Sequence, residues 1–155
     1  MSLTAQIAKQ FRAVYSGGNW TGVNLKETLE GITWQQATTQ VNSFNTIALL
    51  VFHMNYYVGL AINFLQGKPL DGHDKFSFDC PPIKSHEDWE KLVNRLWTDA
   101  ETLAGLIDKL PDSKLEEVFF AEKYGTYYRN LTGIVEHNHY HLGQIVLIKK
   151  LLLQS

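Results

Sequence analysis

The sequence predicts an all-α protein, an antiparallel four-helix bundle with an extra short helix after its first long helix. Four long stretches carry apolar residues at helical spacing, and no stretch of any length alternates apolar and polar residues as a strand does. Glycine or proline follows three of these stretches closely. The chain has 155 residues and no long polar linker, so we expect a single domain over residues 1–155.

The first long helix is predicted over residues 3–15, because the chain reaches Gly17 and Gly18 directly afterwards. Residues 24–31 form the extra short amphipathic helix, with leucine and isoleucine spaced for one face. Residues 33–36 follow as a short element or a capped turn. The second long helix is predicted over residues 43–65 and ends before a glycine and a proline.

A long loop is predicted over residues 67–84, which hold three of the four prolines and two glycines. Ser85 is the expected N-cap of the third long helix, since an acidic residue follows it three positions later. Pro111 ends that helix at residue 110. After a mixed stretch around residues 116–123, the fourth long helix is predicted over residues 126–153.

The second long helix is almost entirely apolar from residue 47 to residue 65. Its length approaches that of a membrane span. We expect no membrane insertion, because His53, Asn55 and Asn63 would be stranded in lipid and no basic flank orients the segment. A helix buried on all sides is the better interpretation. One bundle covers about half of a helix, so we expect a homodimer through this second helix.

Composition and charge exclude several classes of protein. The 14 basic and 16 acidic residues give a net charge of -2 without a basic block, so we expect no nucleic-acid partner. The single cysteine, Cys80, excludes an intrachain disulfide and is either an incidental loop residue or a catalytic thiol. The first residues include Lys9 and Arg12 and lack the apolar core of a signal peptide, so we expect a cytoplasmic protein.

Two histidines at helical spacing form the most informative pattern. His137 and His141 lie four positions apart in the predicted fourth helix, one turn apart on the same face. Two imidazoles at this spacing can converge on one metal ion, as they do in zincins. His53 lies midway along the apolar second helix, where a buried histidine requires a partner. A three-histidine metal centre accounts for all three, and exposed or core hydrogen-bonding histidines are the alternative.

The remaining histidines do not join this pattern. His139 lies about 200° around the helix from His137, so we expect it at the surface or at an interface. His73 and His86 fall in the loop and at a helix start, and we expect both at the surface. The residue after His137 is Asn138, where zincins have glutamate, so a zincin-type protease is not expected.

Several neighbours of the histidines could assist them. Gly133 precedes His137 by one turn and leaves room either for a substrate or His53, or for close helix–helix packing. Helical facing also places a few polar residues near the histidines, although each could equally be an ordinary polar group of a bundle. These residues are Gln144, Tyr56, Tyr57 and Asn130.

The chain resembles the DinB-like metal-binding four-helix bundles, a superfamily that includes YfiT-type metal-dependent hydrolases and low-molecular-weight-thiol transferases. The resemblance lies in the histidine of residues 50–57 and, more strongly, in residues 133–145 with their Tyr-His-Leu-Gly-Gln-Ile ending. Residues 20–22 and 29–33 are similar to the family's segment after its first helix. Helix order and loop placement agree over essentially the whole chain.

This resemblance implies that His53, His137 and His141 bind a divalent metal, that His139 does not, and that the protein forms dimers. Histidine-rich sites accept zinc, nickel, copper and iron, and we expect zinc or nickel here. The implied activity is a metal-dependent enzyme acting on a small molecule, of the small-thiol transferase or hydrolase type. A non-catalytic metal- or ligand-binding bundle, for example in a stress response, is the alternative function.

Overall fold

The computed structural model describes residues 1–154 and confirms the all-α prediction for them. This part of the chain contains six α-helices, four of them long, and no β-strand; a single isolated bridge joins Val118 and Thr126. The long helices are α1 (Leu3–Ser16), α4 (Ile47–Leu65), α5 (His86–Asp108) and α6 (Tyr127–Leu153). The short ones are α2 (Leu25–Leu29) and α3 (Trp34–Thr38), with three 3₁₀ turns, η1 (Asp74–Phe78), η2 (Asp112–Glu116) and η3 (Glu122–Tyr124).

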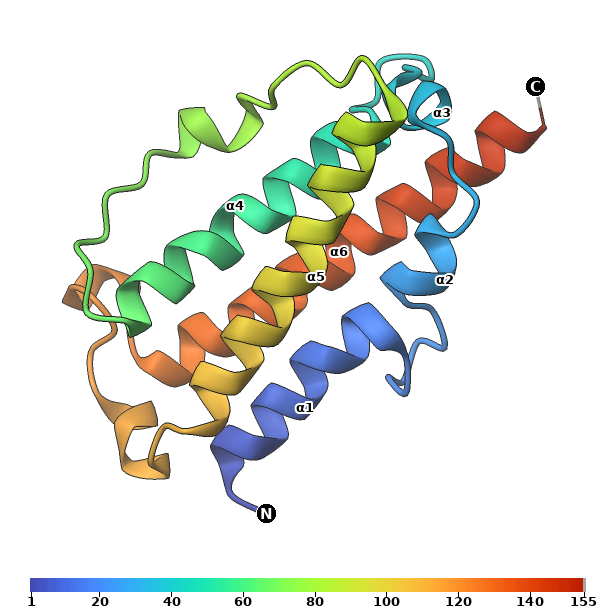
Figure 1. Ribbon diagram of the computed structural model, residues 1–155. Helices are drawn as coiled ribbons and strands as arrows, with labels where there is room; N and C mark the ends of the chain where they lie inside the picture. Colours follow the sequence, from blue (N-terminus) through green and yellow to red (C-terminus); the bar gives the residue numbers. More distant parts are fainter. Residues whose placement is uncertain (155) are drawn as a thin grey trace.

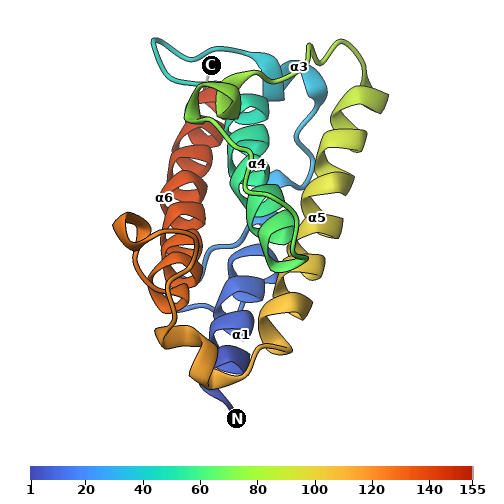
Figure 2. The same ribbon diagram turned by 90° about the vertical axis from the view of Figure 1, so that its left-hand side faces the viewer.

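The four long helices lie side by side in two directions (Figures 1 and 2). Helices α1 and α6 run one way, and α4 and α5 run the other way. Each of α1 and α4 packs on both α5 and α6. The expected antiparallel relation therefore holds for the pairs α1–α5 and α4–α6. It is wrong for two pairs. Helices α1 and α6 run the same way, and α4 and α5 run parallel because residues 66–85 travel back along α4 before α5 begins (Figure 1).

Polar caps set where the helices begin. Ser85 caps α5 as predicted, and its hydroxyl accepts a hydrogen bond from the Asp88 amide at 3.1 Å. Thr46 caps α4 in the same way, so α4 begins at Ile47, four residues later than predicted. Thr33 and Gln36 form a complete capping box, which makes the predicted short element at residues 33–36 a true helix, α3.

The core lies between the four long helices, and each of them contributes fully buried side chains. The largest of these are Phe11 from α1, Leu50 and Met54 from α4, Leu96 and Leu103 from α5, and Leu131 and Ile145 from α6. Their burial removes apolar area from water, which is the main favourable term in folding. Close packing of these side chains restricts the movement of the histidines that lie among them.

Helix α4 is largely covered within the chain. By length and composition it could cross a membrane, and 56% of that apolar window is buried inside the protein. All 19 residues of α4 belong to the described part of the chain, and none of them is exposed. The segment around η1 supplies the outer cover: Gly72 lies directly on Leu60, and the Tyr56 hydroxyl bonds the His73 backbone. The apolar surface that motivated a homodimer is thus largely covered by residues 67–84.

Candidate metal centre

Three histidines from two neighbouring antiparallel helices meet in the protein. His53 comes from the middle of α4, and His137 and His141 lie one turn apart on α6. The Nε2 atom of His137 lies 3.1 Å from the Nε2 of His53 and 3.1 Å from the Nε2 of His141. The ligand atoms of all three lie within 4.8 Å of one another. Nitrogens that share a four-coordinate zinc ion lie about 3.3 Å apart, given Zn–N distances near 2.0–2.1 Å, so the spacing fits one ion.

Hydrogen bonds fix the tautomer of His53. The Nδ1 atom of His53 lies 3.0 Å from the hydroxyl of Ser77, which is fully buried. That hydroxyl donates its only proton to the Asp74 carbonyl at 2.6 Å, so its oxygen accepts from His53 Nδ1. With the proton on Nδ1, the lone pair of Nε2 points into the cluster. A neutral imidazole held in this way is ready to bind a metal.

His141 is oriented by its own helix. Its Nδ1 donates to the side-chain oxygen of Gln144 at 2.6 Å, and the amide nitrogen of Gln144 lies 3.3 Å from the hydroxyl of Tyr140. Nδ1 therefore carries the proton here too, and Nε2 presents a lone pair. Gln144 was one of the polar neighbours singled out in the sequence, and it does contact a site histidine.

His137 is the exception among the three. Its Nδ1 atom is buried and has no hydrogen-bond partner among the described residues. Its ring lies against Tyr57, with the ring centroids 5.0 Å apart and the planes at 73°. Because the two facing Nε2 atoms both present lone pairs, His137 Nε2 can satisfy them only with a proton or by sharing a cation with them.

The three histidines are largely withdrawn from solvent, and burial favours their neutral form. His53 and His141 are buried, and His137 is half-buried. Burial lowers the pKa of all three imidazoles, to about 4 for His137. Repulsion from His141 adds to the lowered pKa of His53 and His137. Neutral imidazole is the form that binds metals, so protons do not compete for these nitrogens near neutral pH.

Aromatic rings wall the cluster. The Phe78 ring stacks on His53 at a centroid distance of 4.1 Å, and Tyr57 meets His53 edge-on at 5.2 Å. Tyr57 is itself held by a short hydrogen bond from its hydroxyl to the Asp74 carboxylate. The turn η1 thus supplies three groups to the site: the Asp74 carboxylate, the Ser77 hydroxyl and the Phe78 ring. Apolar walls of this kind limit water access and lower the local dielectric constant.

The other two polar residues singled out in the sequence, Tyr56 and Asn130, do not contact the three histidines of the cluster. The Tyr56 hydroxyl donates to the His73 carbonyl at 3.0 Å and accepts from the His73 amide at 3.1 Å, so it secures the loop. The Asn130 side chain donates to the carbonyls of Tyr124 and Thr126 at 2.9 and 2.8 Å, at the start of α6. Both residues have structural roles.

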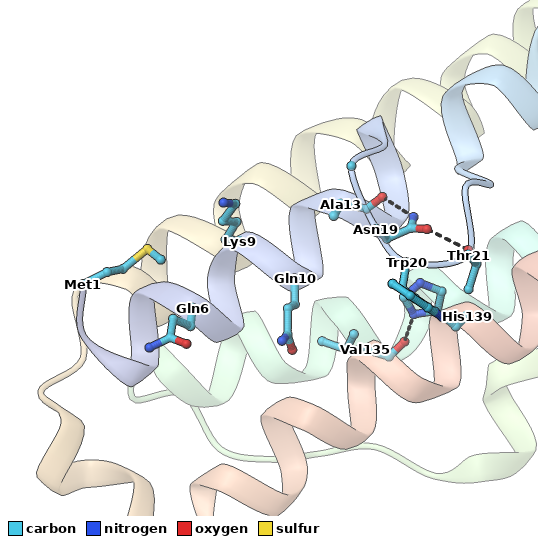
Figure 3. Close-up of a pocket in the computed structure, with 11 residues that line it drawn as sticks. Met1, Gln6, Lys9, Gln10, Ala13, Asn19, Trp20, Thr21, Val135 and His139 are labelled. Carbon is cyan, nitrogen blue, oxygen red and sulfur yellow. Dashed lines mark hydrogen bonds between the residues drawn. The ribbon is translucent and has the colours of Figure 1, made fainter.

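His139 faces the opposite side of α6, as the helical rotation predicted. Its Nδ1 donates to the Val135 carbonyl at 3.1 Å. It is half-buried and lines a hollow of about 490 Å³ between α1, α6 and the loop that carries the fully exposed Trp20 (Figure 3). Asn138 also points away from the cluster, and its amide donates to the buried Tyr15 hydroxyl at 2.8 Å. Neither residue can join the three-histidine cluster.

The remaining chemically reactive residues lie elsewhere. His73 and His86 are exposed, as expected from the sequence. Cys80 is partly buried in the loop, where its thiol donates to the Pro81 carbonyl at 3.4 Å. Burial raises the pKa of this thiol, so it is protonated near neutral pH and a poor nucleophile. Of the two interpretations of Cys80, the incidental one fits its surroundings.

Comparisons with protein-family models, with curated proteins and with solved structures found no match for this chain.

Proposed function

We propose that His53, His137 and His141 hold one divalent metal ion, with zinc or nickel as the expected metal, in a DinB-like four-helix bundle. The observation that supports this best is the convergence of three Nε2 atoms, two pairs of them 3.1 Å apart. Hydrogen bonds from Nδ1 to Ser77 and Gln144 direct two lone pairs to the same point. Three neutral nitrogen ligands match the first-row divalent metals better than the oxygen-preferring ions.

The proposed activity is that of a metal-dependent enzyme acting on a small molecule, as a small-thiol transferase or a hydrolase. Three histidine ligands leave a coordination position open, which is typical of catalytic rather than structural sites. A divalent ion bound there supplies Lewis acidity, which lowers the pKa of water or of a thiol in the open position. The Phe78 and Tyr57 rings pack against His53, and Ser77 and Gln144 hold the imidazoles in place. The family resemblance alone supports thiol transfer over hydrolysis.

Metal content measured by elemental analysis tests the proposed centre. Chelator-treated protein reloaded with zinc or nickel should retain about one ion per chain after dialysis, because the three histidines form one site. His53→Ala, His137→Ala and His141→Ala should each lose it. His139→Ala is the matched control, since it removes the same side chain from the same helix outside the cluster. Equal loss in His139→Ala would contradict the assignment.

Catalysis is tested separately from binding. Metal-loaded wild type and His141→Ala are compared on a panel of small thiols with alkylating electrophiles and on activated esters and amides. We expect turnover by the wild type only, increasing with pH as the nucleophile loses its proton and stopping with chelator. The wild type should hold about one metal ion per chain and His141→Ala none. If the metal contents are as expected and the wild type accelerates no reaction of the panel over the rate in buffer, the non-catalytic metal-binding bundle is the correct function.

A further inference from the structure

A hollow of about 340 Å³ lies directly against His137, and we refer to it as the His137 hollow. Its wall comes from three elements: Tyr57 from α4, Lys123 from η3, and α6 from Arg129 to His137. The volume is near the lower end of the range for small-molecule pockets. A ligand in this hollow touches a member of the histidine cluster.

The charge of the His137 hollow is positive. Lys123 and Arg129 both line it, and no carboxylate of the described residues does. The ion pairs found among residues 1–154 include neither of these cations. The Lys123 ammonium lies over the Tyr124 ring, 4.8 Å from its centroid. Two cations that line one hollow without a carboxylate beside them leave it suited to an anion.

Two glycines shape the hollow. Gly125 has φ +77°, and a Cβ there would lie 2.9 Å from the Arg129 Cδ, so the glycine leaves room for the Arg129 side chain. A Cβ built on Gly133 meets no heavy atom within 4 Å among the described residues, so close helix packing does not explain this glycine. Gly133 instead leaves the floor of the hollow open beside His137.

We propose that the His137 hollow binds the anionic group, carboxylate or phosphate, of the small substrate whose reacting atom lies at the histidine cluster. A guanidinium binds such groups through two parallel hydrogen bonds, and an ammonium adds a second positive charge. This inference rests on the proposed metal site and names the substrate class for it. Lys123 and Arg129 determine specificity, and the histidines hold the metal.

Binding is measured on metal-free protein, so that the result does not depend on the metal centre. The ¹⁵N–¹H NMR spectrum of chelator-treated protein is titrated with 3-mercaptopropionate, with the uncharged 3-mercaptopropan-1-ol, and with inorganic phosphate. We expect 3-mercaptopropionate to shift the Gly133 and Arg129 amide signals at concentrations about tenfold below those needed by the alcohol. If inorganic phosphate shifts the same signals at a still lower concentration, the natural anionic group is a phosphate.

Matched variants locate the binding. Arg129→Gln and Lys123→Gln should each raise the Kd for 3-mercaptopropionate about tenfold. Lys91→Gln on α5 removes the same charge outside the hollow and should leave the Kd unchanged. Gly133→Leu should fill the hollow and abolish the shifts. Gly143→Leu adds the same side chain on α6, at a glycine that also has open space around it, and should retain them.

The outcomes separate this inference from the metal proposal. Equal binding of the charged and uncharged thiols, or no effect of Arg129→Gln and Lys123→Gln, overturns the anion site even if the protein holds its metal. Metal content is measured on the same samples after reloading. A protein that holds no metal but binds 3-mercaptopropionate through Arg129 overturns the proposed metal centre and retains the anion site.

Discussion

At the scale of single residues, the histidine cluster depends on two hydrogen bonds. They fix which ring nitrogen of His53 and of His141 carries the proton. Ser77 and Gln144 each accept a hydrogen bond from a protonated Nδ1 atom, at 3.0 and 2.6 Å. Each bond fixes a ring orientation and leaves Nε2 free to coordinate. Without them, the imidazoles could rotate or change tautomer, and binding a metal would require them to be ordered first.

Gln144→Ala is therefore expected to weaken metal binding without removing a ligand. Partners of this kind typically contribute 10–100-fold to metal affinity, so we expect a loss of about that size. Competition with a chromophoric chelator measures it. Gln6→Ala, an exposed glutamine on α1, should leave the affinity unchanged. If Gln144→Ala keeps the wild-type affinity, the Gln144 bond does not prepare the site.

The lowered histidine pKa values predict how stability depends on pH. An unfolded imidazole has a pKa near 6.5, whereas burial lowers the pKa of His137 to about 4 in the folded chain. Between these values the unfolded state binds more protons. The free energy of unfolding of the metal-free protein should therefore decrease as pH falls from about 6.5 towards about 4. Above pH 6.5, this group should contribute no slope.

Denaturant titration in the presence of chelator, at a series of pH values, measures this dependence. His137→Leu should reduce the slope between pH 6.5 and 4, because it removes one of the three imidazoles whose pKa is lowered on folding. His86→Leu, at an exposed position, should retain the wild-type slope. An unchanged slope in His137→Leu would show that other groups cause the loss of stability in acid.

Much of the candidate site could be predicted at this scale, because helical spacing determines which side chains share a face. The pairing of His137 with His141 and the outward direction of His139 both follow from the 3.6-residue period. Ser77 and Phe78 could not be predicted. They lie in a loop without periodicity, and no local pattern indicates that one serine of that loop reaches a histidine 24 positions earlier in the chain.

At the scale of elements, α1 and α6 are joined by one buried polar contact. The Asn138 amide donates to the Tyr15 hydroxyl at 2.8 Å, and Asn138 is fully buried. Burial raises the pKa of Tyr15, so its hydroxyl stays uncharged, and its oxygen accepts this hydrogen bond. The contact holds α6, with its two site histidines, against α1.

Tyr15→Phe should therefore destabilise the protein by about 1–3 kcal/mol, because the buried amide of Asn138 loses its acceptor. Thermal or denaturant unfolding measures the change. Tyr128→Phe removes a hydroxyl from an exposed tyrosine on α6 and should change stability by less than about 0.5 kcal/mol. Equal stability of Tyr15→Phe and wild type would show that the contact contributes nothing net.

Element types were predictable, whereas some boundaries and the helix directions were not. The helix was predicted to begin near residue 43, but the Thr46 hydroxyl accepts a hydrogen bond from the Leu49 amide and starts the helix one turn later. The composition of residues 67–84 identified a loop correctly. It did not reveal that this loop spans the length of α4, which is what makes α4 and α5 parallel.

At the scale of the whole molecule, the homodimer through α4 stays a prediction. Residues 67–84 cover much of α4, yet a shallow hollow of about 210 Å³ remains between α4 and α5. It is lined by Phe52, Asn55, Tyr56, Gly59, Leu60, Asn63, Leu92 and Arg95. A second copy seated on this surface would bury the half-exposed apolar side chains that the loop leaves accessible.

Sedimentation or light scattering at micromolar concentration should give twice the 17.7 kDa chain mass if α4 forms this interface. Gly59 lines this hollow and has no heavy atom of the described residues within 4 Å of a built Cβ, so Gly59→Arg directs a charged side chain into the hollow. It should convert the dimer to a monomer. Gly105→Arg on α5, where space is also open, should keep the dimer mass. A wild-type protein that sediments as a monomer would mean that residues 67–84 alone complete the cover of α4.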